Sequence, residues 1–499
     1  MVRRCGFLLS LAALASAQDA KADKEWKEFF NGEVRPYWAD AEQPASRVLM
    51  IRKFKKHDHP DAARFLINAI EKDSSAYVLR ESLKILKGYT KEATVAAMAE
   101  AWKAKSEGWQ RKAISLQAFS AIRRQAALEP IHMALASREP GMVVAGCIAA
   151  GVRKHPDFRT PVQKHLRHKT AVVRISATQA IAEMRAEAFV PDLFRLFCGD
   201  PSHRVRFEAW RAITQLTLED FGFDPTGWKK WYDEQVAAVP EGSKSPWGRT
   251  LPVVKSPPKP AYFFTIPVFG DRICFVIDAS ADMDNAWKID VAAERKKKPP
   301  EQTPNFYSVK TRWQLATAQL KRCLNALPSN TKFCCVFYYN KMKPWPPDQR
   351  KFVKNTPKAR DKLFKFMAKE VERKGSTDMG EAFNRAIGFL KEGNPKTNFI
   401  RGCDTIVFLT DGMPTWGDFK NKPDEVRDLV WRAGVTRRLQ VHTVGLYNHA
   451  FELLKALALD SGGLYVHAQE PHDKAEPQDL DFWPEKKKAF EAARKGKKQ

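Results

Sequence analysis

The chain has 499 residues, 44% of them hydrophobic and 11% aromatic, and its 84 Lys and Arg against 58 Asp and Glu give a net charge of +26. This length exceeds what one hydrophobic core organises, so two domains with tails are expected, and the apolar content excludes a disordered chain. The positive charge favours polyanions or acidic proteins as partners, in a salt-dependent way, although solubility in a basic proteome explains it equally well.

Residues 1–17 have the pattern of a secretory signal peptide. Met1-Val2-Arg3-Arg4 precedes an apolar stretch at 7–15, which ends in the small residues Ala15-Ser16-Ala17. That stretch is shorter than the roughly 18 apolar residues of a transmembrane helix, and no later run reaches this length. We therefore expect an exported protein, periplasmic, secreted or at the cell surface, with no transmembrane segment.

Residues 18–240 contain a helical repeat. The pattern of 173–181, Val-Arg followed by small residues, recurs at 205–213, and weaker copies precede it at intervals of about 29 to 35 residues. Turn signals such as Glu139-Pro140-Gly141 separate the copies. The array resembles HEAT-type repeats, which stack helix pairs into an α-solenoid. Its concave face would then dock a protein, or the array would act as a spacer.

A last helix and a linker follow the repeats. Asp224-Pro225 is a helix start signal, and Trp228, Trp231 and Tyr232 share one face of that helix. We expect this aromatic stripe to pack as the cap of the array rather than to form a platform for sugars or bases. Residues 241–261 are rich in Pro, Gly, Ser and Lys, which predicts an extended linker that allows movement between domains.

Residues 262–470 alternate between apolar runs and helical patterns, and residues 471–499 form a basic tail. The runs lie at 273–277, 333–338, 405–409, 441–444 and 464–466, and the helical stretches near 312–326, 357–370, 378–391, 423–433 and 449–459. This alternation predicts a doubly wound, mostly parallel sheet with helices on both faces. The predicted fold class is therefore α + α/β, with an N-terminal α-solenoid.

Oxygen-bearing side chains follow two of these strands and one loop between them. The run 273–277 is followed by Asp278, Ser280 and Asp282, the run 405–409 by Thr410-Asp411-Gly412, and Gly375-Ser376-Thr377-Asp378 lies between. Strand ends of a parallel sheet meet at one edge, where such proteins bind ligands. Hard oxygen donors from three loops predict a divalent-cation site there.

These motifs resemble a von Willebrand factor type A domain with its metal-ion-dependent adhesion site. The family pattern is Asp-x-Ser-x-Ser after the first strand, a Thr from a middle loop, and an Asp after a later strand, and Asp278, Ser280, Thr377 and Asp411 match it. The resemblance implies Mg²⁺ or Ca²⁺ as cofactor, and a ligand oxygen in an open coordination position. Exported bacterial envelope proteins that join such a domain to HEAT-like repeats are similar in organisation.

Asp282 departs from the family pattern, which has Ser there. A third carboxylate would strengthen cation capture and weaken the pull of the cation on an acidic ligand. The alternative is that this longer side chain turns to solvent.

Two functions remain open at this stage. The first is metal-dependent protein binding, in adhesion or in assembly of an envelope complex. The second is an electrostatic binder of an anionic envelope polymer or an acidic protein, with a vestigial metal site. The basic stretch 341–374 and the cluster Arg295, Lys296, Lys297 and Lys298 would carry this second function. Export makes nucleic acid a poor partner for either.

Enzymatic function is not expected. The Asp pair of haloacid dehalogenase-type phosphatases fails at Ser280, and the chain has no Gly-x-Ser-x-Gly elbow and no Walker loop. Asp284 is the nearest candidate for a general base beside the ion, and the resemblance argues against that role.

Overall fold

The computed structural model describes residues 20–38, 43–73, 75–104, 108–222, 225–237, 260–287, 309–347, 352–388, 402–447 and 449–468. The predicted signal peptide, the insertion residues 295–298, nearly all of the predicted linker and the basic tail lie outside these residues. The chain divides into two compact units, Met1–Val162 and Gln163–Gln499. None of the helices in the described ranges combines the length and apolar character that crossing a bilayer requires.

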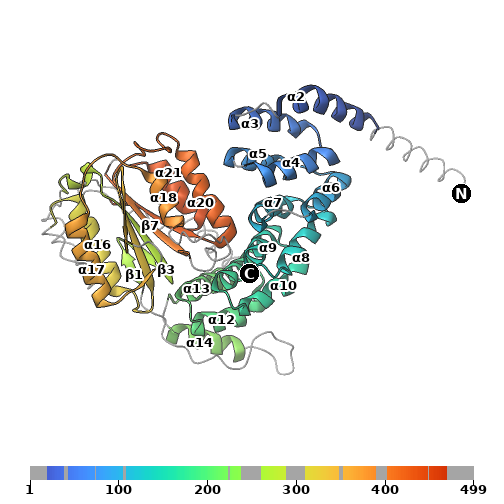
Figure 1. Cartoon of the computed structure of the whole chain (residues 1–499). Coiled ribbons are helices and arrows are strands. Elements are labelled where there is room, and N and C mark those ends of the chain that lie inside the picture. Colours follow the sequence, from blue (N-terminus) through green and yellow to red (C-terminus); the bar gives the residue numbers. More distant parts are fainter. Residues whose placement is uncertain are drawn as a thin grey trace, which may run out of the picture. The chain divides into compact units, whose positions relative to one another are not determined.

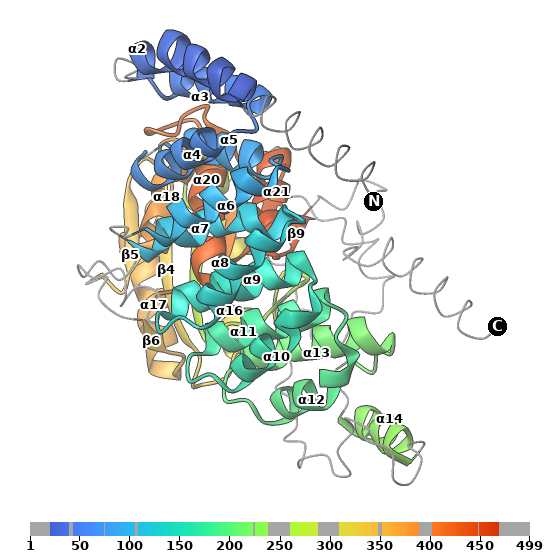
Figure 2. The same cartoon turned by 90° about the vertical axis from the view of Figure 1, so that its right-hand side faces the viewer.

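The first unit is built of helices, as expected. Its helices are α2 (Arg35–Trp38), α3 (Pro44–Lys53), α4 (Pro60–Lys72), α5 (Ala76–Leu86), α6 (Glu92–Lys103), α7 (Trp109–Ala121), α8 (Leu128–Leu135) and α9 (Pro140–Arg153), and α10 (Arg159–Lys164) crosses into the second unit. Alternate helices pack on each other, α3 on α5, α4 on α6 and α7 on α9, and Figures 1 and 2 show them stacked in chain order. Their identity as HEAT repeats stays a prediction.

The second unit continues with α11 (Ala171–Glu183), α12 (Val190–Gly199), α13 (His203–Thr217) and α14 (Pro225–Ala237). Trp228 and Tyr232 of α14 are buried and pack on Phe194 of α12, with ring centroids 5.6 and 5.0 Å away. Trp231 stacks on the same Phe194 ring at 6.0 Å. The aromatic stripe is thus the packed cap that the sequence predicts.

The sheet of the second unit has the order β5-β4-β3-β7-β8-β9, with β6 paired to β4. Its strands are β3 (Arg272–Asp278), β4 (Lys332–Tyr338), β5 (Met342–Trp345), β6 (Val353–Lys354), β7 (Thr405–Thr410), β8 (Gln440–Leu446) and β9 (Tyr465–Ala468). Neighbours are parallel except for β5 and β6, which pair antiparallel with β4. A separate ribbon is formed by β1 (Ala261–Phe263) and β2 (Ile266–Val268).

Helices cover both faces of this sheet, which explains why its strands are continuous apolar runs. Figure 1 shows α16 (Arg312–Ala326) and α17 (Pro357–Glu370) on one face, and α18 (Met379–Ile387), α20 (Pro423–Arg437) and α21 (Phe451–Ser461) on the other. Phe275 of β3 belongs to the core under the first pair, whereas Val276 belongs to the core under the other three. The predicted doubly wound sheet is confirmed.

Helix α13 is bound to the end of the sheet at which the parallel strands β3 and β7 begin. Asp271, just before β3, accepts hydrogen bonds from the Ser202 hydroxyl and from the His203 backbone N–H at 3.0 Å, at the start of α13. Arg204 Nη1 donates to the Asp404 carbonyl before β7, and Phe207 stacks on Phe269 at 4.3 Å.

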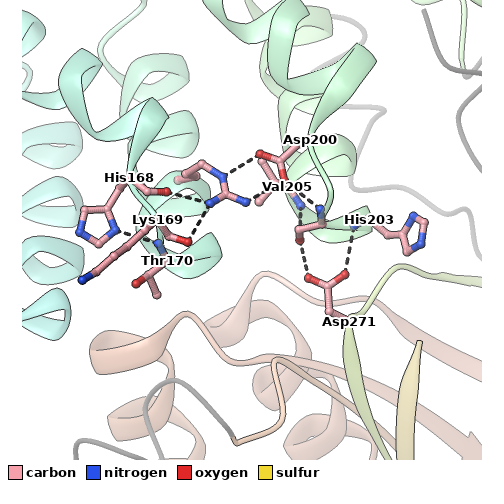
Figure 3. A network of polar contacts seen from close by, with 9 residues as sticks. His168, Lys169, Thr170, Asp200, His203, Val205 and Asp271 are labelled. Atoms are coloured by element: carbon pink, nitrogen blue, oxygen red, sulfur yellow. Dashed lines mark hydrogen bonds and ion pairs between the residues drawn. The ribbon is translucent and has the colours of Figure 1, made fainter. Parts of the chain in front are cut away.

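The same network extends back to α11 (Figure 3). Arg174 donates to both carboxylate oxygens of Asp200, at 2.7 and 2.8 Å, and to the carbonyl of His168 at 2.7 Å. Asp200 in turn accepts from the Ser202 backbone N–H at 2.8 Å. Helices α11 to α13 therefore belong with the sheet, and the division between compact units falls inside the helical domain predicted for 18–240.

Candidate metal centre

Three loops meet at the opposite edge of the sheet, where the parallel strands end. Asp278 ends β3 and Asp411 follows β7, and these strands are paired neighbours with Ile277 opposite Leu409. The loop before α18 joins them, because the Thr415 backbone N–H donates to the Thr377 carbonyl at 3.1 Å. The sequence predicted this convergence, and the structure brings Asp278, Ser280, Thr377 and Asp411 to one edge.

Asp278 is fully buried, with 0% exposure. One of its oxygens accepts from the Ser280 backbone N–H at 2.8 Å and the other from the Thr410 hydroxyl at 2.6 Å. Burial, and then the charge of Asp411, raise the pKa of Asp278 to about 7, although these hydrogen bonds favour the ionised form. A nearby cation would stabilise the charge that burial disfavours.

Two buried oxygens at this edge, Ser280 Oγ and Asp411 Oδ1, have no hydrogen-bond partner among the residues that the structure describes. The Ser280 hydroxyl lies close enough to Asp278 to lower the pKa of that carboxyl, yet it makes no hydrogen bond of acceptable geometry. Buried polar atoms are nearly always paired, so each unpaired oxygen needs an explanation. A hydroxyl and a carboxylate oxygen are donors that Mg²⁺ and Ca²⁺ accept, and these residues therefore fit a divalent cation.

Thr377 is the third predicted donor, and it is 5% exposed. Its Oγ1 lies beside the glycine that follows Asp411, since a Cβ added to Gly412 would stand 3.2 Å from it. The hydroxyl thus lies next to the residue that directly follows Asp411 in the chain.

Asp282 lies at the exposed rim of the site rather than among the buried oxygens. Its carboxylate accepts from Asn285 Nδ2 at 3.3 Å, while its charge still contributes to raising the pKa of Asp411, after burial as the main cause and against Arg312. Asp284 pairs instead with Arg373 at 3.0 Å. Among the described residues, no three side chains of His, Cys, Asp or Glu are grouped to hold a metal ion, so a cation here would depend on hydroxyl and water oxygens as well.

Arg312 is the residue of this site that sequence reasoning missed. It is the first residue of α16, and its Nη1 donates to Asp411 Oδ2 at 2.9 Å with both side chains almost fully buried. Nothing in its sequence position distinguishes it among the 84 Lys and Arg.

Exposed apolar side chains lie in the loops that follow β7 and β8. Met413 and Trp416 lie in the loop after β7 and Tyr447 follows β8, and they are 53%, 50% and 55% exposed. Because the Ala450 backbone N–H donates to the Gly412 carbonyl at 3.3 Å, the loops after β7 and β8 are adjacent. Large exposed apolar groups around a polar centre are typical of protein contact sites.

Of the basic residues predicted to bind a polyanion, the structure describes only one group. Arg295, Lys296, Lys297 and Lys298 lie outside the described residues. Within 341–374, α17 turns Lys358, Lys362, Lys365 and Lys369 to solvent and buries its opposite face.

Comparisons with known proteins give partial matches. No family model matches the chain. Inter-alpha-trypsin inhibitor heavy chain H4 of Homo sapiens is 28% identical over 169 residues, which are 33% of this chain and 17% of that protein. The chain therefore spans less than a fifth of the length of this curated relative.

Solved structures also match in part. A von Willebrand factor type A protein from Catenulispora acidiphila is 14% identical with a TM-score of 0.29, over 40% of this chain and 39% of that one. The SpRpn10 VWA domain is 10% identical with a TM-score of 0.28, over 40% and 89%. Proximal thread matrix protein 1 of the mussel byssus, with a zinc-occupied MIDAS motif, is 16% identical with a TM-score of 0.25, over 39% and 41%.

Proposed function

We propose that this chain is an exported protein that binds another protein through a divalent cation, Mg²⁺ or Ca²⁺, at the carboxyl edge of its sheet. The observation that carries the proposal is the pair of buried, unpartnered oxygens, Ser280 Oγ and Asp411 Oδ1, where three loops converge. Asp278, Ser280, Thr377 and Asp411 would hold the cation, with Asp282 at the rim. An oxygen atom of the partner would then serve as a further ligand of the bound cation.

The surroundings of the site support binding rather than catalysis. Met413, Trp416 and Tyr447 offer large apolar contacts around a small polar centre, which is the arrangement of an interface core. Asp284, the candidate general base in the sequence, is paired with Arg373, so it is not placed as a free base. Adhesion or assembly of an envelope complex is the role we propose.

Thermal unfolding of the full chain, with EDTA and with added Mg²⁺ or Ca²⁺, tests the cation. An ion at 100 times its dissociation constant should stabilise the fold by about 2.7 kcal/mol. The informative variant is Ser280→Ala, because the Ser280 hydroxyl makes no hydrogen bond to the described residues, so its removal should cost little in EDTA. We expect its stability in EDTA to stay close to that of the wild type, and its response to the ion to fall.

Asp284→Ala is the matched control, since it removes a nearby carboxylate that is paired at the surface. It should keep the full response to the ion. No response of the wild type to any divalent ion would refute the proposal, and an equal loss in both variants would refute the assignment of Ser280.

A second function is favoured by the exposed lysines of α17. Under this alternative, a polyanion or an acidic protein binds the basic surface without a metal. Raising the salt concentration would then abolish binding while EDTA would not. The metal-dependent function predicts the reverse order of sensitivity.

A further inference from the structure

Arg312 places a full positive charge inside the candidate metal centre. Its side chain is 6% exposed and that of Asp411 0%, and the two are joined by the bond of 2.9 Å from Nη1 to Oδ2. Nη1 also lies 3.4 Å from the Asp282 carbonyl. The position of Arg312 is fixed by its backbone as well, because its N–H donates to the Asn285 carbonyl at 3.2 Å in the loop after β3.

Tyr447 holds the guanidinium from the other side. The ring of Tyr447 lies 4.3 Å from Arg312 Cζ, a cation–π distance. The Tyr447 backbone has a φ of 52°, in the left-handed region that a bulky residue rarely adopts. The structure around it therefore keeps this ring over the guanidinium despite the local strain.

The two oxygens of Asp411 have different environments. Oδ2 accepts from Arg312, whereas Oδ1 is buried and has no hydrogen-bond partner among the described residues. A buried carboxylate needs a compensating charge, and in this structure Arg312 supplies it. A divalent cation held by Oδ1 would share the same carboxylate with the guanidinium, and the two positive charges would repel each other in a site of low dielectric constant.

We propose that Arg312 is an internal counter-ion of the centre: it neutralises Asp411 when no cation is bound, and it thereby weakens the binding of a divalent cation. This inference rests on the proposed function. Arg312 is almost fully buried and contacts Asp411, so it acts by positioning and by charge. Tyr447, half-exposed at the rim, keeps the guanidinium at Asp411.

Isothermal titration of the full chain with Mg²⁺ and with Ca²⁺ tests the inference. Arg312→Gln should lower the dissociation constant at least about tenfold, because it removes the competing charge. In EDTA the same variant should melt at a lower temperature than the wild type, because Asp411 is left buried and unpaired. Arg373→Gln, which removes an arginine paired with Asp284 instead, should leave the dissociation constant unchanged.

Arg312→Lys tests whether the charge of Arg312 or the shape of its guanidinium matters. It can also be measured if Arg312→Gln does not fold. It keeps the positive charge but loses the planar guanidinium, so its affinity for the ion should stay within about threefold of the wild type. Equal tightening in the Gln and Lys variants would overturn the role of charge, and unchanged or weaker binding in Arg312→Gln would overturn the inference as a whole.

A double-mutant cycle measures the coupling free energy between Arg312→Gln and Asp411→Asn in EDTA. Together with the ion titrations, it distinguishes failure of the counter-ion inference from failure of the proposed function. Coupling in EDTA without any response to ions in the wild type or in Arg312→Gln would mean a structural ion pair, and would refute both proposals. A wild type that binds the ion, with Arg312→Gln binding no more tightly, would refute the counter-ion alone.

Discussion

Asp271→Ala should weaken the attachment of α13 to the sheet and lower the stability of the second unit. The Asp271 carboxylate lies at the N-terminus of α13, where it accepts from the Ser202 hydroxyl and from the His203 N–H. The Ser202 hydroxyl also accepts from the Val205 N–H at 3.2 Å, as the cap of the helix. That cap survives the substitution, so the loss falls on the contact between helix and sheet.

The expected loss is about 3–4 kcal/mol of unfolding free energy. Each hydrogen bond to a charged group contributes about 1.5–3 kcal/mol, with the lower end appropriate for a half-buried carboxylate such as Asp271. An anion at a helix N-terminus adds about 0.3–1 kcal/mol. Asp271→Asn keeps one acceptor oxygen and loses the charge, so about half of the loss should remain.

Urea unfolding followed by circular dichroism measures the free energy, and hydrogen exchange locates it. In the wild type, the amides of α13 and of β3 should be protected to a similar degree, whereas in Asp271→Ala α13 should exchange faster. Asp233→Ala is the control, since its ion pair with Lys229 is exposed and should contribute at most about 1 kcal/mol. A loss below about 0.5 kcal/mol, with unchanged exchange in α13, would refute the docking role of Asp271.

Three further perturbations probe the second unit. Burial, and then the arginines of α13, lower the pKa of His442 to about 3. Because the unfolded chain binds this proton up to about pH 6.5, the unfolding free energy should rise between pH 3 and pH 6.5, by up to about 5 kcal/mol. His442→Gln should flatten this part of the curve in urea unfolding. Glu208→Gln should lower the unfolding free energy by about 3–5 kcal/mol, because Glu208 is buried between two arginines at 3.7 and 3.5 Å; a loss below 1 kcal/mol would contradict this. Gly380→Ala should lower the unfolding free energy by about 1–3 kcal/mol, since the new Cβ would stand 2.0 Å from Phe419. A Cβ at Gly434 in α20 would meet nothing within 4 Å, so Gly434→Ala should raise the unfolding free energy by up to about 1 kcal/mol. Equal effects of the two glycine variants would contradict the packing argument.

The sequence was most informative where side chains are buried on both sides. The five parallel strands were predicted, and for β3, β4, β7 and β8 the reason is that a strand covered by helices on both faces must be apolar throughout. Helix α17 was predicted at 357–370, where Thr356 caps it and Pro357 begins it. The edge strands β5 and β6 were not predicted, because β5 contains Lys343 and Pro344 and is mostly half-buried, so it lacks the pattern of a buried strand.

The candidate site, too, could be predicted from the sequence only in part. Asp278 and Asp411 were placed together from sequence because each directly follows a buried strand, and strand order brings such ends together. Arg312 could not be placed, since its contact with Asp411 depends on how α16 begins after the loop that follows β3. The rim position of Asp282 likewise depends on the path of that loop, which the motif alone does not determine.

The two ends of the parallel strands have different roles, and strand β3 runs from one end to the other. Asp271 precedes β3 and receives α13, whereas Asp278 ends β3 at the candidate metal centre. Seven residues of extended strand span about 23 Å, well beyond the range within which substitutions usually interact. Asp271→Ala and Ser280→Ala should therefore combine additively within about 0.5 kcal/mol, in EDTA and with the ion alike. A larger interaction that appears only with the ion would mean that β3 transmits cation binding to α13, and the helices of the second unit would then respond to the ligand.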